Sequence, residues 1–389
     1  MSSANMRVAE TSTSAVAHNL RTIKDQSGGA EVIAIVKANG YGHGAEIMAR
    51  ALLAGDCKML GVVDIDEALA LRHAGITPEQ ADILCWLHSA HTDFYSAFAA
   101  DIEIAISDME QLERVATAAK FIKKARNTGD FTAKTPALHI KLDTGMSRNG
   151  VGRDTWPAIF AKCAALEKDG VLRVRGIMTH LANAGKDADL AQCAEFDAAV
   201  DIARAAGLAP ELLHVAASAA VFSDHVPRYN TVRVGLATYG LSPFAGTASA
   251  DLGLRPAMRM VTEIVALRQA PAGTSVSYGY TYTTECDTVL ALLPLGYADG
   301  LPRALNNYGA TVSIAGLPRP IVGRIGMDQC IVDVGTELGA RLQLGDKVVM
   351  FGDPTRGEPA VDTWAESMQT INYEIVACLG ARPQRVAVS

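Results

Sequence analysis

Long apolar runs, paired cysteines and an excess of positive charge are all missing from this chain of 389 residues. No apolar run is long enough to span a bilayer, so we expect no membrane segment. The seven cysteines are scattered and form no Cys-x-x-Cys pair, which indicates reduced thiols in a cytoplasmic protein and no metal site. The net charge of −7 argues against a nucleic-acid partner or an anionic membrane surface. The N-terminus lacks a basic start followed by an apolar core, so no signal peptide is expected.

One basic stretch runs against this charge balance. Residues 120–134 read KFIKKARNTGDFTAK, and we interpret them as the solvated end of a helix and a loop. The segment 120–135 is also a candidate insertion at the surface. Hydrophobic residues make up 49% of the chain and charged residues 20%, which is enough core material for two domains.

Strand-like and helix-like segments alternate through the first 245 residues. Apolar residues recur at helical spacing between the strand-like runs, and the helical segment 187–207 ends in glycine. Eight strands, most of them followed by a helix, predict a (β/α)8 TIM barrel over residues 1–245. An open doubly wound sheet is the alternative if fewer of the strands exist. The expected strands are 31–37, 59–63, 82–87, 102–107, 137–143, 173–180, 211–217 and 231–236.

The pattern changes after residue 245. Runs of β-branched residues broken by glycine and proline predict a C-terminal mainly-β domain over residues 246–389. A single late helix is expected within residues 363–380. The boundary is expected in residues 241–256, which are rich in small residues and turn formers.

The polar residues at the strand ends suggest chemistry, because active residues of a barrel gather at the carboxyl ends of its strands. Lys37 ends an apolar run, and a lysine held against apolar walls has a lowered pKa and can form a Schiff base. Ser218 and the backbone of VRVGL (232–236) suit a phosphate. A lysine with a phosphate site suggests pyridoxal phosphate, as one interpretation among several.

The motif AIVKANGYGHG (34–44) resembles the cofactor-lysine signature of alanine racemases, and further motifs follow in that family's order along nearly the whole chain. The resemblance implies a barrel followed by a β domain, pyridoxal 5'-phosphate as cofactor, and a homodimer. Each active site would lie between the barrel of one subunit and the β domain of the other. The further motifs are KLDTGMSRNG (141–150), MTHLA (178–182), VRVGLATYGL (232–241), VSYGYTYTT (276–284), LPLGYADGLPR (293–303), VGRIGMDQ (322–329) and TINYEI (370–375).

Two residues carry the reaction in this resemblance. Lys37 would be the Schiff-base lysine and the base on the D-face of the substrate, and Tyr278 of the partner subunit would be the base on the L-face. Together they imply a two-base mechanism on a pyridoxal phosphate aldimine, because racemisation removes a proton on one face and returns it on the other. Taken alone, Tyr278 would be an ordinary tyrosine of the β domain.

The resemblance also implies the cofactor contacts. Arg233 would face the ring nitrogen, which should stay largely unprotonated because arginine keeps its own protons. His180 would link Arg233 to Tyr278. The cofactor-binding set implied is Lys37, Tyr41, His180, Ser218, Arg233, Gly235, Leu236 and Tyr373.

For the substrate, the resemblance implies that Arg148 binds the carboxylate, with Met327 and Asp328 close to it and Tyr297 at the mouth of the site. Lys141 matches a lysine that is carbamylated in many members, where the carbamate would position the arginine. The alternative is an unmodified Lys141 paired with Asp143.

Two positions depart from the pattern: Ala217 stands where asparagine is common, and Gly326 where cysteine is common. They affect the expected cofactor affinity and substrate preference.

The function implied is interconversion of L-alanine and D-alanine, for peptidoglycan precursors or for D-alanine catabolism. A broad-specificity, serine or lysine racemase of the same family remains open. A decarboxylase of the same architecture is disfavoured by Tyr278 and Arg233, and a non-catalytic cofactor carrier is disfavoured by the full β domain.

Overall fold

The structure, a computed structural model, describes residues 6–129 and 134–389. The chain divides into two compact units. The barrel unit consists of Asn19–Gly40 and Ala49–Thr238, and the β unit consists of the residues up to His18, Tyr41–Met48 and Tyr239–Ser389. Among the described residues, no helix has both the length and the apolar character needed to cross a membrane.

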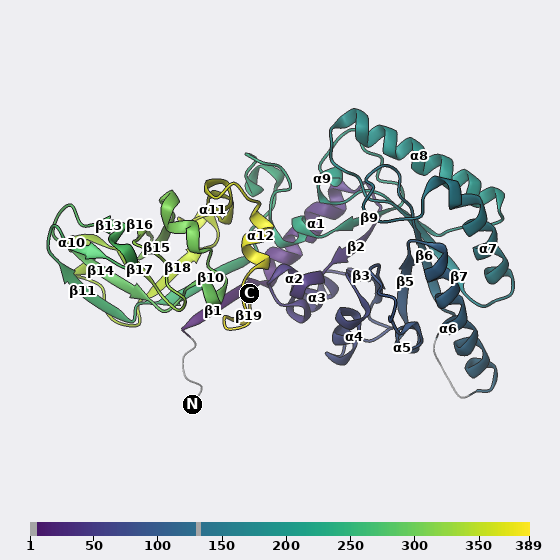
Figure 1. Ribbon diagram of the computed structural model, residues 1–389, viewed down its shortest axis with the longest axis horizontal. Coiled ribbons are helices and arrows are strands. Elements are labelled where there is room, and N and C mark those ends of the chain that lie inside the picture. Colours follow the sequence, from purple (N-terminus) through teal and green to yellow (C-terminus); the bar gives the residue numbers. More distant parts are fainter. Residues whose placement is uncertain (1–5, 130–133) are drawn as a thin grey trace. The chain divides into compact units, whose positions relative to one another are not determined.

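A closed barrel of eight parallel strands forms the barrel unit (Figure 1). The strands follow one another in chain order, and the first and last pair to close the barrel, with Val32 beside Val232. All eight expected strands are confirmed, and the open doubly wound sheet is excluded. The strands are β2 (Glu31–Ile35), β3 (Met59–Val62), β4 (Asp82–Cys85), β5 (Ile102–Ile106), β6 (Ala137–Lys141), β7 (Arg173–Met178), β8 (Leu212–His214) and β9 (Thr231–Val234).

Helices cover the outside of the barrel, so both faces of its strands are buried and most strand residues are apolar (Figure 1). Aspartates begin three of these helices: the carboxylates of Asp64, Asp93 and Asp108 accept backbone N–H groups of the first helical turn. The helices after the first two strands are α3 (Ala45–Ala54) and α4 (Ile65–His73), followed by α5 (Phe94–Ala99), α6 (Met109–Asn127), α7 (Trp156–Lys168), α8 (Lys186–Ala205) and α9 (Ser218–Val221).

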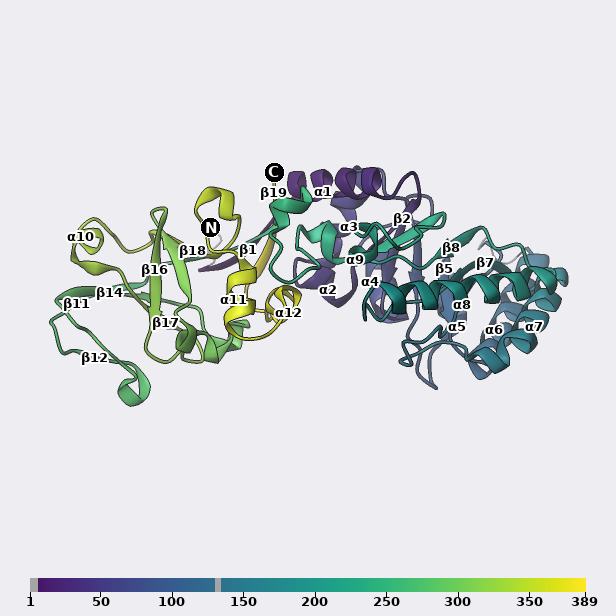
Figure 2. The same ribbon diagram turned by 90° about the horizontal axis from the view of Figure 1, so that it is seen from above.

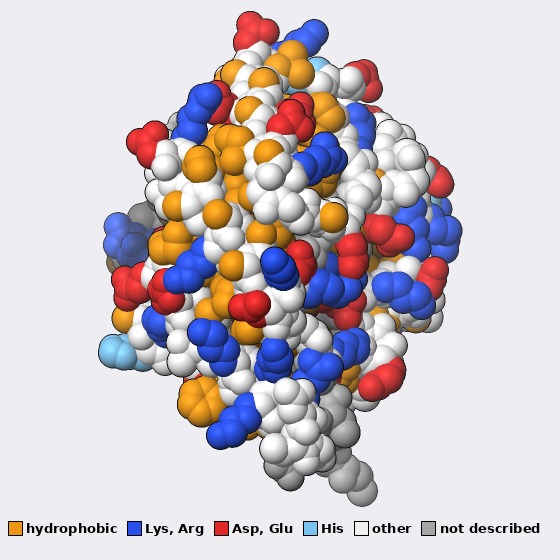
Figure 3. Space-filling view, turned by 90° about the vertical axis from the view of Figure 1, so that its right-hand side faces the viewer, with side chains coloured by type: hydrophobic (Ala, Val, Ile, Leu, Met, Phe, Trp, Pro, Cys, Tyr) orange, Lys and Arg blue, Asp and Glu red, His pale blue; other side chains and the backbone are white. Residues whose placement is uncertain are grey.

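The basic stretch lies at the end of α6. Residues 120–127 are helical, residues 128 and 129 form a turn, and residues 130–133 of the expected surface insertion lie outside the described residues. Figure 3 shows this end of the barrel unit, where Lys and Arg side chains lie among Asp and Glu. The helical part of the stretch is therefore a solvated, basic helix end.

A nine-stranded sheet forms the core of the β unit, in the order β11-β14-β17-β16-β15-β18-β10-β1-β19. Strand β1 (Arg7–Ser12) belongs to this sheet, where it pairs with β10 and β19. This differs from the expected assignment of all residues 1–245 to the barrel. A single N-terminal strand carries no signal of which sheet it joins. The other strands are β10 (Met258–Glu263), β11 (Ala266–Ala270), β14 (Thr288–Leu293), β15 (Thr311–Ile314), β16 (Leu317–Val322), β17 (Cys330–Asp333), β18 (Lys347–Phe351) and β19 (Gln384–Val388).

The single late helix expected within residues 363–380 is wrong. Two short helices, α11 (Val361–Ser367) and α12 (Asn372–Ala377), are separated by Gln369 in the left-handed region at φ 56°. A non-glycine residue in this region interrupts a right-handed helix. Figure 2 also shows a small hairpin, β12 (Ser275–Val276) and β13 (Tyr282–Thr283), that extends from the sheet and carries a short turn at its end.

Candidate active site

Lys37 follows β2 at the carboxyl end of the barrel. The next three residues, Ala38 to Gly40, all have left-handed backbone, and the N–H of Ala38 donates to Glu67 Oε1 at 2.7 Å. The chain therefore leaves the strand through a sharp turn that holds the lysine at the strand end. Burial and then the charge of Arg148 lower the pKa of Lys37, while Glu67 raises it.

Lys141 ends β6 and is buried, and Arg148 lies in the exposed loop that follows. That loop is fixed by Asp143, whose carboxylate accepts the N–H groups of Gly145 and Ser147, each at 3.0 Å. Burial first, and then the charges of Arg148 and Arg233, lower the pKa of Lys141 to about 8. The strand ends thus bring cationic side chains together in one place.

Arg233 lies on β9, and its side chain is buried inside the barrel. Its guanidinium donates to the carbonyl groups of Thr179 at 2.6 Å and His214 at 2.5 Å, and lies 3.2 Å from His180 Nδ1. Arginine can only donate, so His180 Nδ1 accepts and its proton sits on Nε2. Burial, followed by the charge of Arg233, lowers the pKa of His180 to about 3 and keeps the ring neutral.

A hydrogen-bonded chain behind Arg233 was not foreseen from sequence. His139 Nδ1 lies 2.9 Å from His214 Nε2, and His139 Nε2 lies 2.9 Å from Glu103 Oε2. The Glu103 carboxylate can only accept, so His139 Nε2–H donates to it, and His214 Nε2–H donates to His139 Nδ1. His214 Nδ1 is then an acceptor for Arg233 Nη1, at 3.4 Å. Gly176 provides the space, since a Cβ there would lie 2.3 Å from His139 Nδ1.

The barrel unit also places the groups that are expected to bind a phosphate at its strand ends. Ser218 begins α9, and its hydroxyl accepts the N–H of Ala237 at 3.3 Å. Gly235 and Leu236 follow β9 at the start of a 3-10 helix (Leu236–Tyr239), where the first N–H groups have no partner inside the helix. Ala217 caps α9 without a side-chain hydrogen bond, which is the contact that asparagine would supply.

Tyr41 and Tyr373 belong to the β unit. The ring of Tyr41 stacks on Tyr239 with centroids 4.6 Å apart. Burial raises the pKa of Tyr41, with a second contribution from the nearby Tyr373 hydroxyl on α12. The two phenols therefore lie close enough to serve one ligand, and the Tyr41 hydroxyl stays a protonated donor at neutral pH.

Tyr278 lies in the turn at the end of the β12–β13 hairpin (Figure 2), with 74% of its surface exposed. Ser277 precedes it at φ 61° and donates its hydroxyl to the carbonyl of Arg324 at 2.6 Å. Tyr280, in the same turn, is similarly exposed. Large exposed aromatic side chains grouped in one turn are typical of an interaction surface.

Two loops of the β unit carry Tyr297, Met327 and Asp328, and all three side chains are exposed. The loops lie side by side, because the N–H of Tyr297 donates to the carbonyl of Gly326 at 3.1 Å and that of Ala298 to Met327 at 2.9 Å. The expected substrate-binding residues of the β domain thus form one surface.

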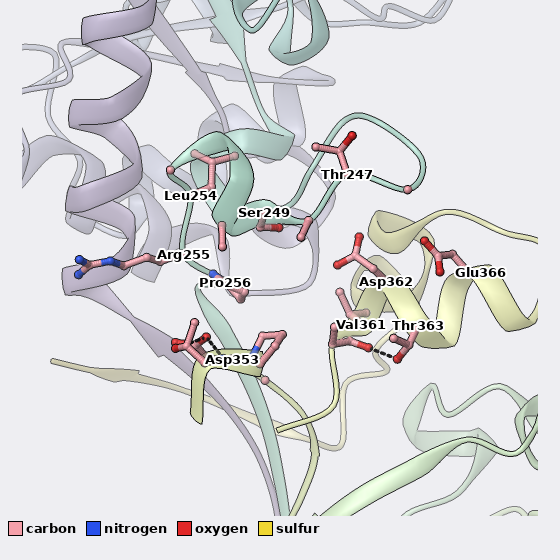
Figure 4. A pocket seen from close by; sticks show the side chains of 18 of the residues that line it. Thr247, Ser249, Leu254, Arg255, Pro256, Asp353, Val361, Asp362, Thr363 and Glu366 are labelled. Atoms are coloured by element: carbon pink, nitrogen blue, oxygen red, sulfur yellow. Dashed lines mark hydrogen bonds between the residues drawn. The ribbon is translucent and has the colours of Figure 1, made fainter. Parts of the chain in front are cut away.

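A separate hollow of about 910 Å³ in the β unit contains none of the expected site residues (Figure 4). Segments 246–256 and 360–366 form opposite walls, with Asp362 and Glu366 among the side chains facing it. The site and this hollow are distinct. Within the described ranges, no group of three or more His, Cys, Asp or Glu could hold a metal ion.

Two models of protein families match this chain, one over each of its two parts. Residues 11–243 match the model of the alanine racemase N-terminal domain, and residues 257–387 that of the C-terminal domain. An alanine racemase of Frankia casuarinae is 42% identical over 375 residues, covering 95% of this chain and 93% of that protein. One of Mycolicibacterium smegmatis is 40% identical, covering 95% and 92%.

Solved structures of alanine racemases are also similar to this chain. The crystal structure of alanine racemase from D-cycloserine-producing Streptomyces lavendulae has a TM-score of 0.90 and 37% identity, covering 100% of this chain and 98% of that one. The alanine racemase from Streptomyces coelicolor has a TM-score of 0.89 and 37% identity, covering 98% of each chain. The chain belongs to the alanine racemase family and is an isomerase of that family.

Proposed function

We propose that the protein interconverts L-alanine and D-alanine with pyridoxal 5'-phosphate as cofactor. The observation that carries the proposal is the cluster of Lys37, Arg148 and Arg233 at the barrel's strand ends, in which the half-buried Lys37 has a lowered pKa. Such a cluster suits a ligand with several negative charges, as a phosphorylated cofactor and a carboxylate substrate have together.

The residues present fit this cofactor. Arg233 is buried, burial lowers its pKa to about 10, and within the described residues no carboxylate pairs with it, which leaves its outer face suited to a neutral acceptor such as a pyridine nitrogen. Lys37 would hold the cofactor covalently. Its phosphate would be held by the Ser218 hydroxyl, the backbone N–H groups of Gly235 and Leu236, and the hydroxyls of Tyr41 and Tyr373. When bound, pyridoxal phosphate withdraws electrons from the substrate's α-carbon and makes its C–H bond acidic.

Lys37 and Tyr278 would move the proton. The lowered pKa of Lys37 increases the share of neutral amine, the form that accepts a proton, on the D-face of the substrate. Tyr278, supplied by the partner subunit, would act on the L-face. The exposed position of Tyr278 at a hairpin end supports a role against another subunit, and hence a homodimer with shared sites.

The tautomer of His180 supports Tyr278 as a base. Because His180 Nδ1 accepts from Arg233, Nε2 carries the hydrogen and can donate to a phenolate oxygen. Such a donor stabilises the deprotonated tyrosine and lowers its pKa. Arg233, which keeps its protons, would also leave the ring nitrogen largely unprotonated, a weaker electron sink that limits side reactions.

Substrate recognition would use groups from both units. Arg148 would bind the carboxylate, with Met327 and Asp328 of the partner subunit beside it and Tyr297 at the mouth of the site. Alanine is the proposed substrate, and a serine, lysine or broad-specificity racemase is the alternative. We further propose a cytoplasmic role in supplying D-alanine for peptidoglycan or in degrading it.

Two variants test the two-base assignment. Tyr278→Phe should keep the cofactor absorbance and lose most racemisation of L-alanine, whereas the matched control Tyr280→Phe, in the same turn, should keep both. Lys37→Ala should lose the covalent link to the cofactor, which borohydride makes permanent in the parent protein. Wild-type rates from L-alanine in Tyr278→Phe would contradict the assignment. A cofactor-loaded protein that racemises none of L-alanine, L-serine and L-lysine would favour a carrier or a decarboxylase.

A further inference from the structure

Asp299 in the β unit is a carboxylate with no exposed surface. It lies in the turn Tyr297–Asp299, where its Oδ2 accepts the N–H of Gly296 at 2.9 Å. Its Oδ1 forms ion pairs with Arg7 Nε at 3.1 Å and Arg382 Nε at 2.8 Å. A buried charge is costly unless it is paired, so the fold maintains this arrangement across three distant segments of the chain.

Arg382 connects this buried carboxylate to the surface. Its Nη1 donates to Asp328 Oδ1 at 2.7 Å, while its Nε faces Asp299. One guanidinium thus bridges a fully buried acid and a largely exposed one. Asp328 therefore has a fixed direction that an exposed aspartate on a loop would not otherwise have.

The turn at Asp299 also holds the neighbouring loop closely. A Cβ on Gly296 would lie 2.4 Å from the carbonyl oxygen of Gly326 and 2.5 Å from that of Met327, so only glycine permits this approach. The backbone hydrogen bonds of Tyr297 and Ala298 to the second loop complete the contact. Asp299 is therefore the anchor of both loops that present Tyr297, Met327 and Asp328.

We propose that Asp299 and Arg382 are positioning residues for the substrate, which orient Asp328 and Tyr297 and thereby set the preference for a small amino acid. The proposal rests on the proposed function, since it takes the two loops to face the substrate carboxylate. Neither residue needs to touch the substrate. Asp299 holds the turn through Gly296 and pairs with Arg382, which in turn holds Asp328 by a hydrogen bond.

Arg382→Ala in the cofactor-loaded full-length protein is the first test. The pair with Asp328 is partly exposed, so we expect KM for L-alanine to rise about two- to fivefold, with a smaller change in kcat. The ratio of kcat/KM for L-alanine to that for L-serine should fall. This ratio does not depend on the amount of folded enzyme, so a merely structural role would leave it unchanged. Arg382→Lys should restore part of the preference.

Arg341→Ala is the matched control, because Arg341 is an exposed arginine of the same unit that pairs with Glu337. It should leave KM and the preference unchanged. The double variant Arg382→Ala with Asp328→Ala should raise KM no further than Asp328→Ala alone. Additive effects would overturn the proposed route through Asp328.

Asp299→Asn tests the anchor itself, and thermal unfolding shows how much of this variant is folded. If it folds, its preference for L-alanine over L-serine should fall at least as far as in Arg382→Ala. An unchanged preference in both variants would overturn the inference while the parent protein still racemises alanine. Failure of the parent protein to racemise alanine would instead contradict the proposed function.

Discussion

Lys141 should carry a carbamate when carbon dioxide is present. Only a neutral amine adds to carbon dioxide, forming a new N–C bond and releasing a proton. The pKa of Lys141 falls from 10.5 to about 8, which raises the neutral fraction by about 240-fold, to about a quarter of the molecules near pH 7.5. An ordinary lysine would be neutral in about 0.1% of molecules at that pH.

The surroundings of Lys141 also favour the product. Arg148, Arg233 and Lys37 all disfavour a positive charge there, and Asp143 opposes them. A carbamate replaces that charge with a negative one beside the same cations, and its two oxygens could hold the planar guanidinium of Arg148 in place. We therefore expect Lys141→Ala to raise KM for L-alanine, and acetate to restore part of the loss.

Carbon-13 NMR of the protein in labelled bicarbonate would detect the carbamate directly. The signal should vanish in Lys141→Ala and persist in Lys58→Ala, because Lys58 pairs with Asp56 and its pKa is raised. An active enzyme with no signal that depends on Lys141 would refute the reasoning and leave an unmodified lysine beside Asp143.

Three further outcomes follow from the same structure. Gly176→Ala should push His139 away and cost about 1–3 kcal/mol of stability, measured by denaturant unfolding. His180 and His88, with pKa values lowered to about 3 and 4, bind a proton more readily when unfolded, near pH 6.5. The free energy of unfolding should therefore fall as the pH drops from about 6.5 toward 4, which thermal unfolding would show as a lower Tm. Tyr41→Phe should weaken cofactor affinity about tenfold in a titration of the cofactor-free protein.

Much of the barrel could be predicted from the sequence. Runs such as 59–63 are apolar throughout, because a parallel strand covered on both faces meets no water. Lys37, at the end of such a run, was a candidate site residue for the same reason. The β unit was less readable: β16 contains Pro318 and Pro320, which normally argue against a strand, and β12 and β13 are only two residues long.

The tertiary structure alone decided the partners of these residues. Glu103, His139, His214 and Arg233 lie on four different strands, and each taken singly is an ordinary buried polar residue. Closure of the barrel turns them inward and places them within hydrogen-bonding distance. Arg7 and Arg382 likewise reach Asp299 only through the sheet that pairs β1 with β19.

The sequence by itself determined the fold class, the family and the candidate chemistry, because periodicity and motifs are local properties of the chain. Hydrogen bonds, ion pairs and pKa shifts depend instead on distances across space and on exclusion of water. Those follow from closure of the barrel and pairing in the sheet, so the proton on His180 and the anchor at Asp299 became visible only in the folded structure.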